Sequence, residues 1–140
     1  MDRYKKVIRI FLIIFAVILV AAIGLYVYFS LAFSIFSRDY YDDLIIQSPD
    51  GKGFLIIKEW SFLLGSGAEV YYVKGEKDWW FNKTELGETG VGDDGYCPFQ
   101  DGKYIIDWQE DYVEIKYYTA VPAQSPKDPD TWRVDRFDLP

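Results

Sequence analysis

The chain has 140 residues, enough for one compact domain and an appendage but too few for two large domains. It carries 15 Lys and Arg against 22 Asp and Glu, with one cysteine and no histidine. The lack of histidine excludes Ser-His-Asp and Cys-His catalytic sets and the usual imidazole ligands of zinc, and a single cysteine excludes an intramolecular disulfide.

The N-terminal part of the chain contains a long uncharged run. No charged residue occurs between Ile10 and Ser37. Because about 20 apolar residues suffice to cross a bilayer core of about 30 Å, the run predicts one transmembrane α-helix over residues 10–37. Aromatic residues gather toward its C-terminal end, where amphipathic rings suit a membrane interface. The lipid bilayer is therefore an expected partner of this segment.

The charges that flank the run predict its orientation. Basic residues precede the run, and aspartates follow it within a few positions. Because cytoplasmic flanks carry an excess of Lys and Arg, residues 1–9 are predicted to be cytoplasmic and residues 38–140 extracytoplasmic, as in a single-pass signal anchor of the cell membrane. The basic residues that carry this prediction are Arg3, Lys5, Lys6 and Arg9.

Two other interpretations of the run stay open. A cleaved signal peptide has a similar basic start, and Ser30-Leu31-Ala32 has the small residues of a cleavage site, but its apolar region is usually only about 7 to 15 residues long. A buried core helix of a soluble protein is the second alternative, although core helices rarely stay uncharged over this length. The length of the run favours a membrane anchor.

The part of the chain after the run is strongly acidic. From Arg38 onward it has 11 Lys and Arg against 21 Asp and Glu. Phosphate backbones are bound by Lys and Arg, so no nucleic-acid partner is predicted. The same charge opposes docking on an anionic membrane surface and favours basic proteins or metal cations as partners.

Residues 38–140 contain short runs rich in β-branched and aromatic residues, which predict strands. Between them lie segments with turn chemistry, among them SPDG before the second run and LLGSG after it. The pattern predicts an all-β ectodomain, built as an antiparallel sheet, a sandwich or an open barrel. The predicted strands are LIIQ, FLIIKEWSF, AEVYYV, WWFNKTE, KYIIDW, YVEIKYY and a last strand near TWRVDRF.

Three segments of this part also indicate burial or exposure. In YVEIKYY, Val113, Ile115 and Tyr117 share one face, so this strand is predicted to have one buried and one wet side. FLIIKEW is apolar on both faces at its start, which favours a central strand. Residues 119–131 contain three prolines and little periodicity, which predicts a surface loop, with a docking segment for a partner as the alternative.

All five tryptophans lie in the acidic part of the chain. Most aromatic residues of a small β domain are in its core, because each buries about 150 to 250 Å². Trp79 and Trp80 are adjacent, and neighbours in a strand point to opposite faces, so one of the two is predicted to be exposed. Because exposed rings stack on sugar faces, the pair is a candidate binding surface for a cell-wall glycan.

The stretch from Gly87 to Tyr104, GETGVGDDGYCPFQDGKY, holds five glycines and four acidic residues. Asp93, Asp94 and Asp101 are candidate ligands of an irregular cation site, because hard cations prefer carboxylate oxygens. The spacing does not match an EF-hand, since two of these residues are adjacent and the closing glutamate is missing. The competing interpretation is that DDG and QDG are turns, with glycine supplying a positive φ. No acid and base roles can be assigned, so no catalytic residue and no cofactor is predicted.

The order of the motifs resembles a known family. One N-terminal span, then SPDG, then GSGAEVYYV and DGKYIIDW, is similar to small single-span proteins anchored in the membrane of Gram-positive bacteria, grouped as a DUF5412-like family. The resemblance covers Ile45 to about Tyr118. It implies a β domain that faces the cell envelope, and it carries over no catalytic residue.

Together these observations predict a membrane-anchored extracytoplasmic binding or protein-interaction module of the cell envelope. One alternative is a cation-dependent envelope enzyme or enzyme subunit that uses the acidic, glycine-rich stretch. The other is a protein that binds cell-wall glycan through an exposed tryptophan.

Overall fold

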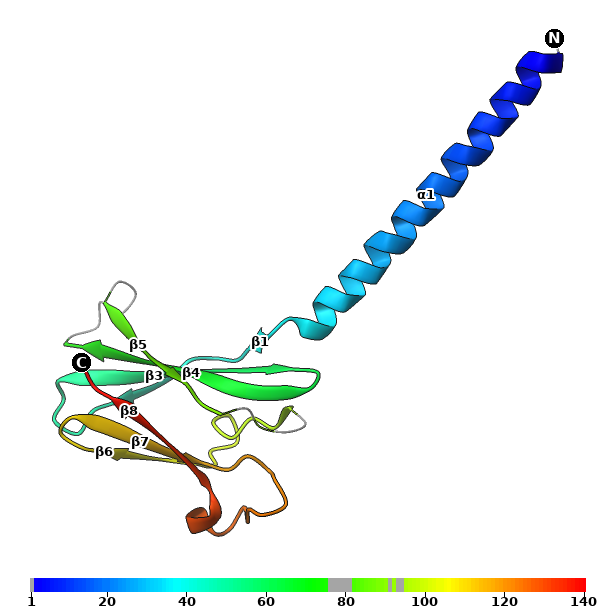
Figure 1. Cartoon of the computed structure of the whole chain (residues 1–140). Coiled ribbons are helices and arrows are strands. Elements are labelled where there is room, and N and C mark those ends of the chain that lie inside the picture. The colour runs from blue at the N-terminus through cyan, green and yellow to red at the C-terminus, as the bar shows by residue number, and fades with distance from the viewer. Residues whose placement is uncertain (1, 76–81, 91, 93–94) are drawn as a thin grey trace. The chain divides into compact units, whose positions relative to one another are not determined.

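The computed structural model describes residues 2–75, 82–90, 92 and 95–140. The chain divides into two compact units, Met1–Ser37 and Arg38–Pro140. The first unit is a single helix, and the second is built from antiparallel strands (Figure 1). This confirms the predicted fold class of one N-terminal apolar helix followed by an all-β domain.

The first unit is α1, a 35-residue helix that spans Asp2–Phe36. Its intrahelical hydrogen bonds satisfy the backbone, while almost all side chains after Ile10 are apolar, as a bilayer requires. At 1.5 Å per residue the helix is about 52 Å long, which exceeds a bilayer core of about 30 Å. The helix is thus long and apolar enough to cross a membrane.

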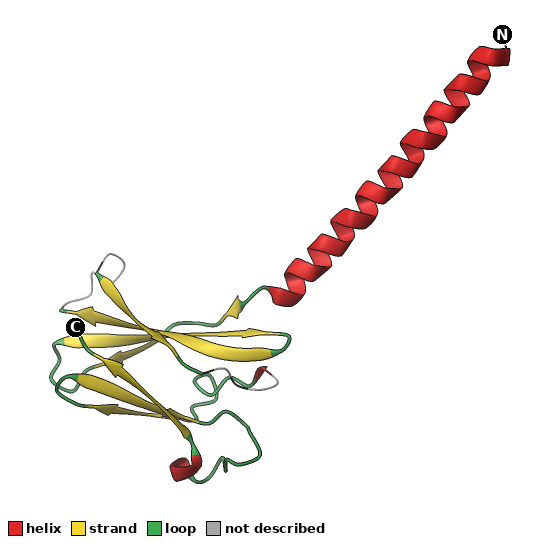
Figure 2. Cartoon of the chain, in the orientation of Figure 1, coloured by secondary structure: helices red, strands yellow, loops and turns green. Residues whose placement is uncertain are grey.

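A five-stranded antiparallel sheet forms one layer of the β domain (Figure 2). Its strands are β1 (Asp39–Tyr40), β2 (Leu44–Gln47), β3 (Gly53–Phe62), β4 (Gly65–Lys74) and β5 (Lys83–Glu88). β4 lies between β3 and β5, while β1 and β2 follow one another along the other edge of β3. β3 is therefore a central strand, as its apolar character on both faces predicts.

A three-stranded antiparallel sheet forms the second layer. Its strands are β6 (Tyr104–Trp108), β7 (Tyr112–Tyr117) and β8 (Arg133–Asp138), with β7 in the middle. A short 3₁₀ helix, η2 (Pro129–Thr131), precedes β8, and Asp128 caps it by accepting a hydrogen bond from the N–H of Asp130. The predicted surface loop at 119–131 thus ends in a capped helical turn.

The core lies between the two sheets, so the architecture is a sandwich. The inner face of β3 contributes Leu55 and Ile57, and β7 contributes the predicted buried face of Val113, Ile115 and Tyr117. The alternation in YVEIKYY is therefore confirmed. The other buried members of the cluster are Ala68, Val70, Phe99 and Phe137.

Several predicted element bounds differ from the observed ones. The predicted turn LLGSG is reduced to Leu63 and Leu64, because β4 already begins at Gly65. β1 has only two residues, too few to give a sequence signal. The predicted strand WWFNKTE falls partly outside the described residues, and β5 begins at Lys83. Strand pairing across the sheet, rather than local propensity, decides these bounds.

Candidate functional site

The predicted site residues fall into three groups: those that lie outside the described residues, the basic residues at the start of α1, and Asp101. Asp93, Asp94, Trp79 and Trp80 lie outside the described residues, so the cation site and the tryptophan surface stay predictions. The described residues contain no group of three Cys, Asp or Glu side chains that would hold a metal ion. Arg3, Lys5, Lys6 and Arg9 are exposed on the first turns of α1, and their role in orientation stays a prediction.

Asp101 belongs to a turn that is hydrogen-bonded to a buried residue of the core. Its N–H donates to the carbonyl oxygen of Cys97, and Gly102 follows with a φ of 66°. The turn interpretation of QDG is therefore confirmed. The same turn is held by Glu59 of β3, whose carboxylate accepts hydrogen bonds from the backbone N–H groups of Phe99 at 3.0 Å and Gln100 at 2.8 Å.

Glu59 is an unusual residue for the interior of a sandwich. It lies on the inward face of β3 and is only 1% exposed. Burial raises the pKa of its carboxyl group, and the two backbone N–H donors oppose that rise. The role of this carboxylate is structural, because it satisfies two backbone donors of the turn and so places Phe99 in the core.

A cleft at one end of the β domain combines aromatic and charged side chains. This cleft, here called the turn cleft, has a volume of about 380 Å³. The β2–β3 turn lines one side, and the β6–β7 turn and the C-terminal end line the other. Its residues are Ser48, Pro49, Asp50, Lys52, Tyr72, Trp108, Gln109, Glu110 and Leu139.

The SPDG sequence builds one wall of the turn cleft. The Ser48 hydroxyl donates to Asp50 Oδ1 at 2.6 Å and accepts from the Gly53 N–H at 3.0 Å. The Lys52 N–H donates to the same Asp50 oxygen at 3.0 Å, and Gly51 adopts a φ of 71° that favours glycine. These bonds fix the Asp50 carboxylate, so the wall is rigid although its side chains reach solvent.

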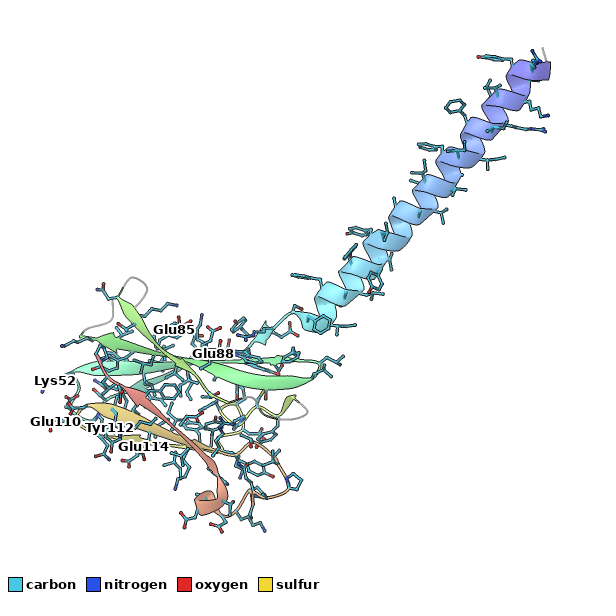
Figure 3. The ribbon with its side chains drawn as sticks, viewed as in Figure 1. Lys52, Glu85, Glu88, Glu110, Tyr112 and Glu114 are labelled. Carbon is cyan, nitrogen blue, oxygen red and sulfur yellow. The ribbon has the colours of Figure 1, made fainter. Side chains whose placement is uncertain are left out.

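The β6–β7 turn and two aromatic side chains build the rest of the cleft. The turn is closed by a hydrogen bond from the Gln109 N–H to the Tyr112 carbonyl at 2.9 Å. Tyr72 of β4 packs its ring over Gly53, where a Cβ atom would overlap the ring. Figure 3 shows Lys52 and Glu110 at the same end of the domain, although they come from different sheets.

The electrostatics of the turn cleft favour binding over acid–base catalysis. Hydrogen bonds from the Ser48 hydroxyl and the Lys52 N–H lower the pKa of Asp50, so its carboxylate stays ionised and accepts hydrogen bonds. Burial, together with the negative Asp50, raises the pKa of Tyr72, so the phenol stays a donor. Ser48 is occupied by Asp50 and Gly53, which leaves it unsuited to act as a nucleophile.

A second cluster of polar side chains lies on the outer face of the five-stranded sheet. Glu69 of β4 accepts hydrogen bonds from the hydroxyls of Tyr40 and Tyr71, each at 2.7 Å. Arg38 lies 3.0 Å from Glu88 and 3.6 Å from Glu69. Burial alone would raise the pKa of Glu69, but the two hydroxyls and the Arg38 charge outweigh it and lower that pKa.

The role of this outer cluster is structural, because it binds the segment that follows α1 to the five-stranded sheet. The guanidinium of Arg38 lies 3.9 Å from the centroid of the Trp60 ring, which is buried. Trp60 packs in turn over Gly67, where a Cβ atom would come within 2.7 Å of the ring. Cation–π contact and ion pairing together hold Arg38 and β1 on the sheet.

The turn cleft was not predicted from the sequence as a site. SPDG and QED carry the signal of turns, and Trp108 is a strand residue like many others. Nothing in the local pattern indicates that the two turns meet, because they belong to different sheets. Only the packing of the sheets places Tyr72 and Trp108 beside both turns.

Comparisons with protein-family models, with curated proteins and with solved structures found no significant match to this chain. The resemblance to the DUF5412-like family therefore stays a prediction. The character of α1 and the geometry of the turn cleft are the observations from which a function can be inferred.

Proposed function

We propose that this chain is a single-span membrane protein whose acidic β domain is a binding module at the outer face of the cell membrane. The length and apolar character of α1 support the anchor. The basic residues at its start support a cytoplasmic N-terminus and an extracytoplasmic β domain. The domain then belongs to the cell envelope, where its ligands are wall or surface components.

The turn cleft is the observation that carries the binding role. It joins two aromatic side chains, Tyr72 and Trp108, to an ionised carboxylate at Asp50 and an ammonium group at Lys52. Ligand sites typically combine ring surface with a few fixed polar groups. Saccharides have apolar C–H faces and many hydroxyl groups, so a cell-wall saccharide matches this lining better than a purely apolar ligand does.

Retention of the full-length protein on purified cell-wall material tests this role. The test variant is Lys52→Ala with Glu110→Ala, which removes exposed charges at the rim of the turn cleft. The matched control is Lys127→Ala with Asp130→Ala, which removes one exposed charge of each sign elsewhere on the domain. We expect retention to fall several-fold for the first variant and to stay at the wild-type level for the control.

Equal retention of both variants and the wild type would remove the turn cleft as the binding site. If the wild type itself is not retained, the saccharide is the wrong ligand. Crosslinking in cells, followed by co-purification, would then show whether the domain binds an envelope protein instead.

The orientation is tested separately, with a protease and a tag placed after Pro140. In intact cells an added protease is expected to remove the tag. Full protection until lysis would place the β domain in the cytoplasm and contradict the proposed location.

A further inference from the structure

The β3–β4 hairpin ends in two leucines that the fold of the β domain does not require. Leu63 is 69% exposed and Leu64 is 66% exposed. Tight turns are usually made by Gly, Asn, Asp, Pro or Ser, so turn chemistry gives no reason for this pair. Phe62 beside them is only partly covered. This hairpin tip is therefore an apolar projection that indicates a contact with something else.

Strand register within the β domain places the hairpin tip beside the start of the domain. Asp39 pairs with Ser61, and Tyr40 pairs with Trp60. The tip begins two residues beyond Ser61 along β3. The first strand after α1 and the hairpin tip therefore lie at the same end of the five-stranded sheet.

Chain length then limits the distance between the hairpin tip and the end of α1. Phe36 and Asp39 are three residues apart, so their Cα atoms are separated by at most about 11 Å. Paired strands lie about 5 Å apart, and two residues of strand add about 7 Å. These lengths keep Leu63 within about 23 Å of Phe36 for any orientation of the domain. The hairpin tip is thus within reach of the interface where a membrane-spanning α1 would emerge.

The surroundings of the tip indicate the kind of contact. Tyr40 and Tyr41 are 52% and 42% exposed, and tyrosine is enriched at membrane interfaces. The charged groups nearby in the sequence are Arg38, which is paired with Glu88, and Asp39, Asp42 and Asp43. Carboxylates are repelled by anionic headgroups, so electrostatic attraction to lipid is excluded here. A lipid contact at this place must be hydrophobic.

We infer that Leu63 and Leu64 insert into the outer interface of the membrane that α1 spans, which makes the hairpin tip a second, shallow lipid contact. This inference rests on the proposed function, because it requires α1 to be in the membrane. It also has a consequence for that function. The turn cleft lies at the opposite end of β3, ten residues or about 30 Å away, so a tip held in lipid directs the cleft away from the membrane.

Single-cysteine fluorescence on the full-length protein in phosphatidylcholine vesicles tests the inference. In a Cys97→Ser background, an environment-sensitive probe is attached at Leu64→Cys, at Ile105→Cys or at Leu19→Cys. Ile105 is 44% exposed on β6 in the other sheet, so it is the matched control, and Leu19 reports whether α1 is in lipid. Quenching by a spin label on the lipid headgroup or acyl chain is compared with quenching by iodide in water.

We expect the lipid-borne label to quench the probe at position 64 several-fold more than the probe at position 105, with iodide showing the reverse order. Replacing neutral lipid by anionic lipid should not strengthen the effect at position 64. If position 19 is quenched by lipid while 64 behaves like 105, the anchor stands and the inference is wrong. If position 64 is shielded from both quenchers, the tip contacts protein, such as a second copy, and the inference is also wrong. Lack of lipid quenching at position 19 would refute the anchor and the inference together.

Discussion

Glu59 gives the sharpest test of how the β domain is held together. Glu59→Ala removes the carboxylate that accepts from the N–H groups of Phe99 and Gln100, at 3.0 and 2.8 Å. Each buried donor left without a partner costs about 1–3 kcal/mol. The relief of a buried charge offsets part of that sum, so we expect the free energy of unfolding to fall by about 2–4 kcal/mol. Glu59→Gln keeps one acceptor oxygen, so its free energy of unfolding should lie between those of the wild type and of the alanine variant.

The pH dependence of this loss has a definite sign. Because burial raises the pKa of Glu59 in the folded state, the folded protein binds more protons than the unfolded chain between the ordinary glutamate pKa and the raised one. Stability contributed by this residue therefore rises as pH falls through the raised pKa. The alanine variant lacks this titration, so the difference in stability between wild type and variant should widen toward acid pH.

The assay uses the full-length protein in neutral detergent micelles. All five tryptophans lie in the β domain and none in α1, so tryptophan fluorescence reports unfolding of that domain alone. Denaturant titrations at several pH values give the unfolding free energies. An alanine variant within about 0.5 kcal/mol of the wild type would mean that the turn does not depend on Glu59. A difference that narrows toward acid pH would refute the sign of the pKa argument.

Three further substitutions test other parts of the domain by the same unfolding assay. Gly53→Ala places a Cβ atom within the ring of Tyr72, so it should destabilise the domain by about 1–3 kcal/mol and distort the turn cleft; an unchanged midpoint would contradict this packing. Tyr117→Phe removes a hydroxyl that accepts from the N–H of Gly90 at 2.7 Å and donates to Asp135; because Asp135 also accepts from the Gly90 N–H at 3.0 Å, we expect a loss of about 1 kcal/mol; an unchanged stability would mean that Asp135 and water satisfy these groups equally well without the hydroxyl. Arg38→Ala should lower the free energy of unfolding by only about 1 kcal/mol, and this loss should hardly depend on salt, because exposed ion pairs contribute little beside the cation–π contact. A loss that depends strongly on salt would mean that the ion pairs contribute more than the cation–π contact.

The local sequence determined the elements of this protein. The uncharged run from Ile10 to Ser37 is longer than the roughly 20 apolar residues that cross a bilayer core, so its chemistry alone predicts an apolar helix. Alternation in β7 predicts its buried face, because side chains point to opposite sides of a strand at every step. The SPDG turn is set by Gly51, whose positive φ suits glycine. Each of these depends on residues that are close in the sequence.

The tertiary structure decided where those elements meet. β1 pairs with β3, because Asp39 lies opposite Ser61 and Tyr40 opposite Trp60. It is held there by the hydrogen bond from Tyr40 to Glu69 and by the guanidinium of Arg38 over the Trp60 ring rather than by its own propensity. Glu59 has the sequence pattern of an ordinary strand glutamate, yet the turn that it satisfies lies 40 residues later. The charge and strand propensity of Glu59 do not indicate which turn it binds, because any of several turns offers the same backbone N–H donors.

The turn cleft and the hairpin tip also combine features that the local sequence predicts with features that only the tertiary structure decides. Both ends of β3 are visible in the sequence as turns, SPDG at one end and LLGSG at the other. Which turn lies beside the second sheet and which ends in exposed leucines depends on how the three-stranded sheet packs on the five-stranded one. Turn chemistry is local and can be predicted, whereas the packing of two sheets sums many weak apolar contacts between distant residues, and only the folded chain determines their outcome.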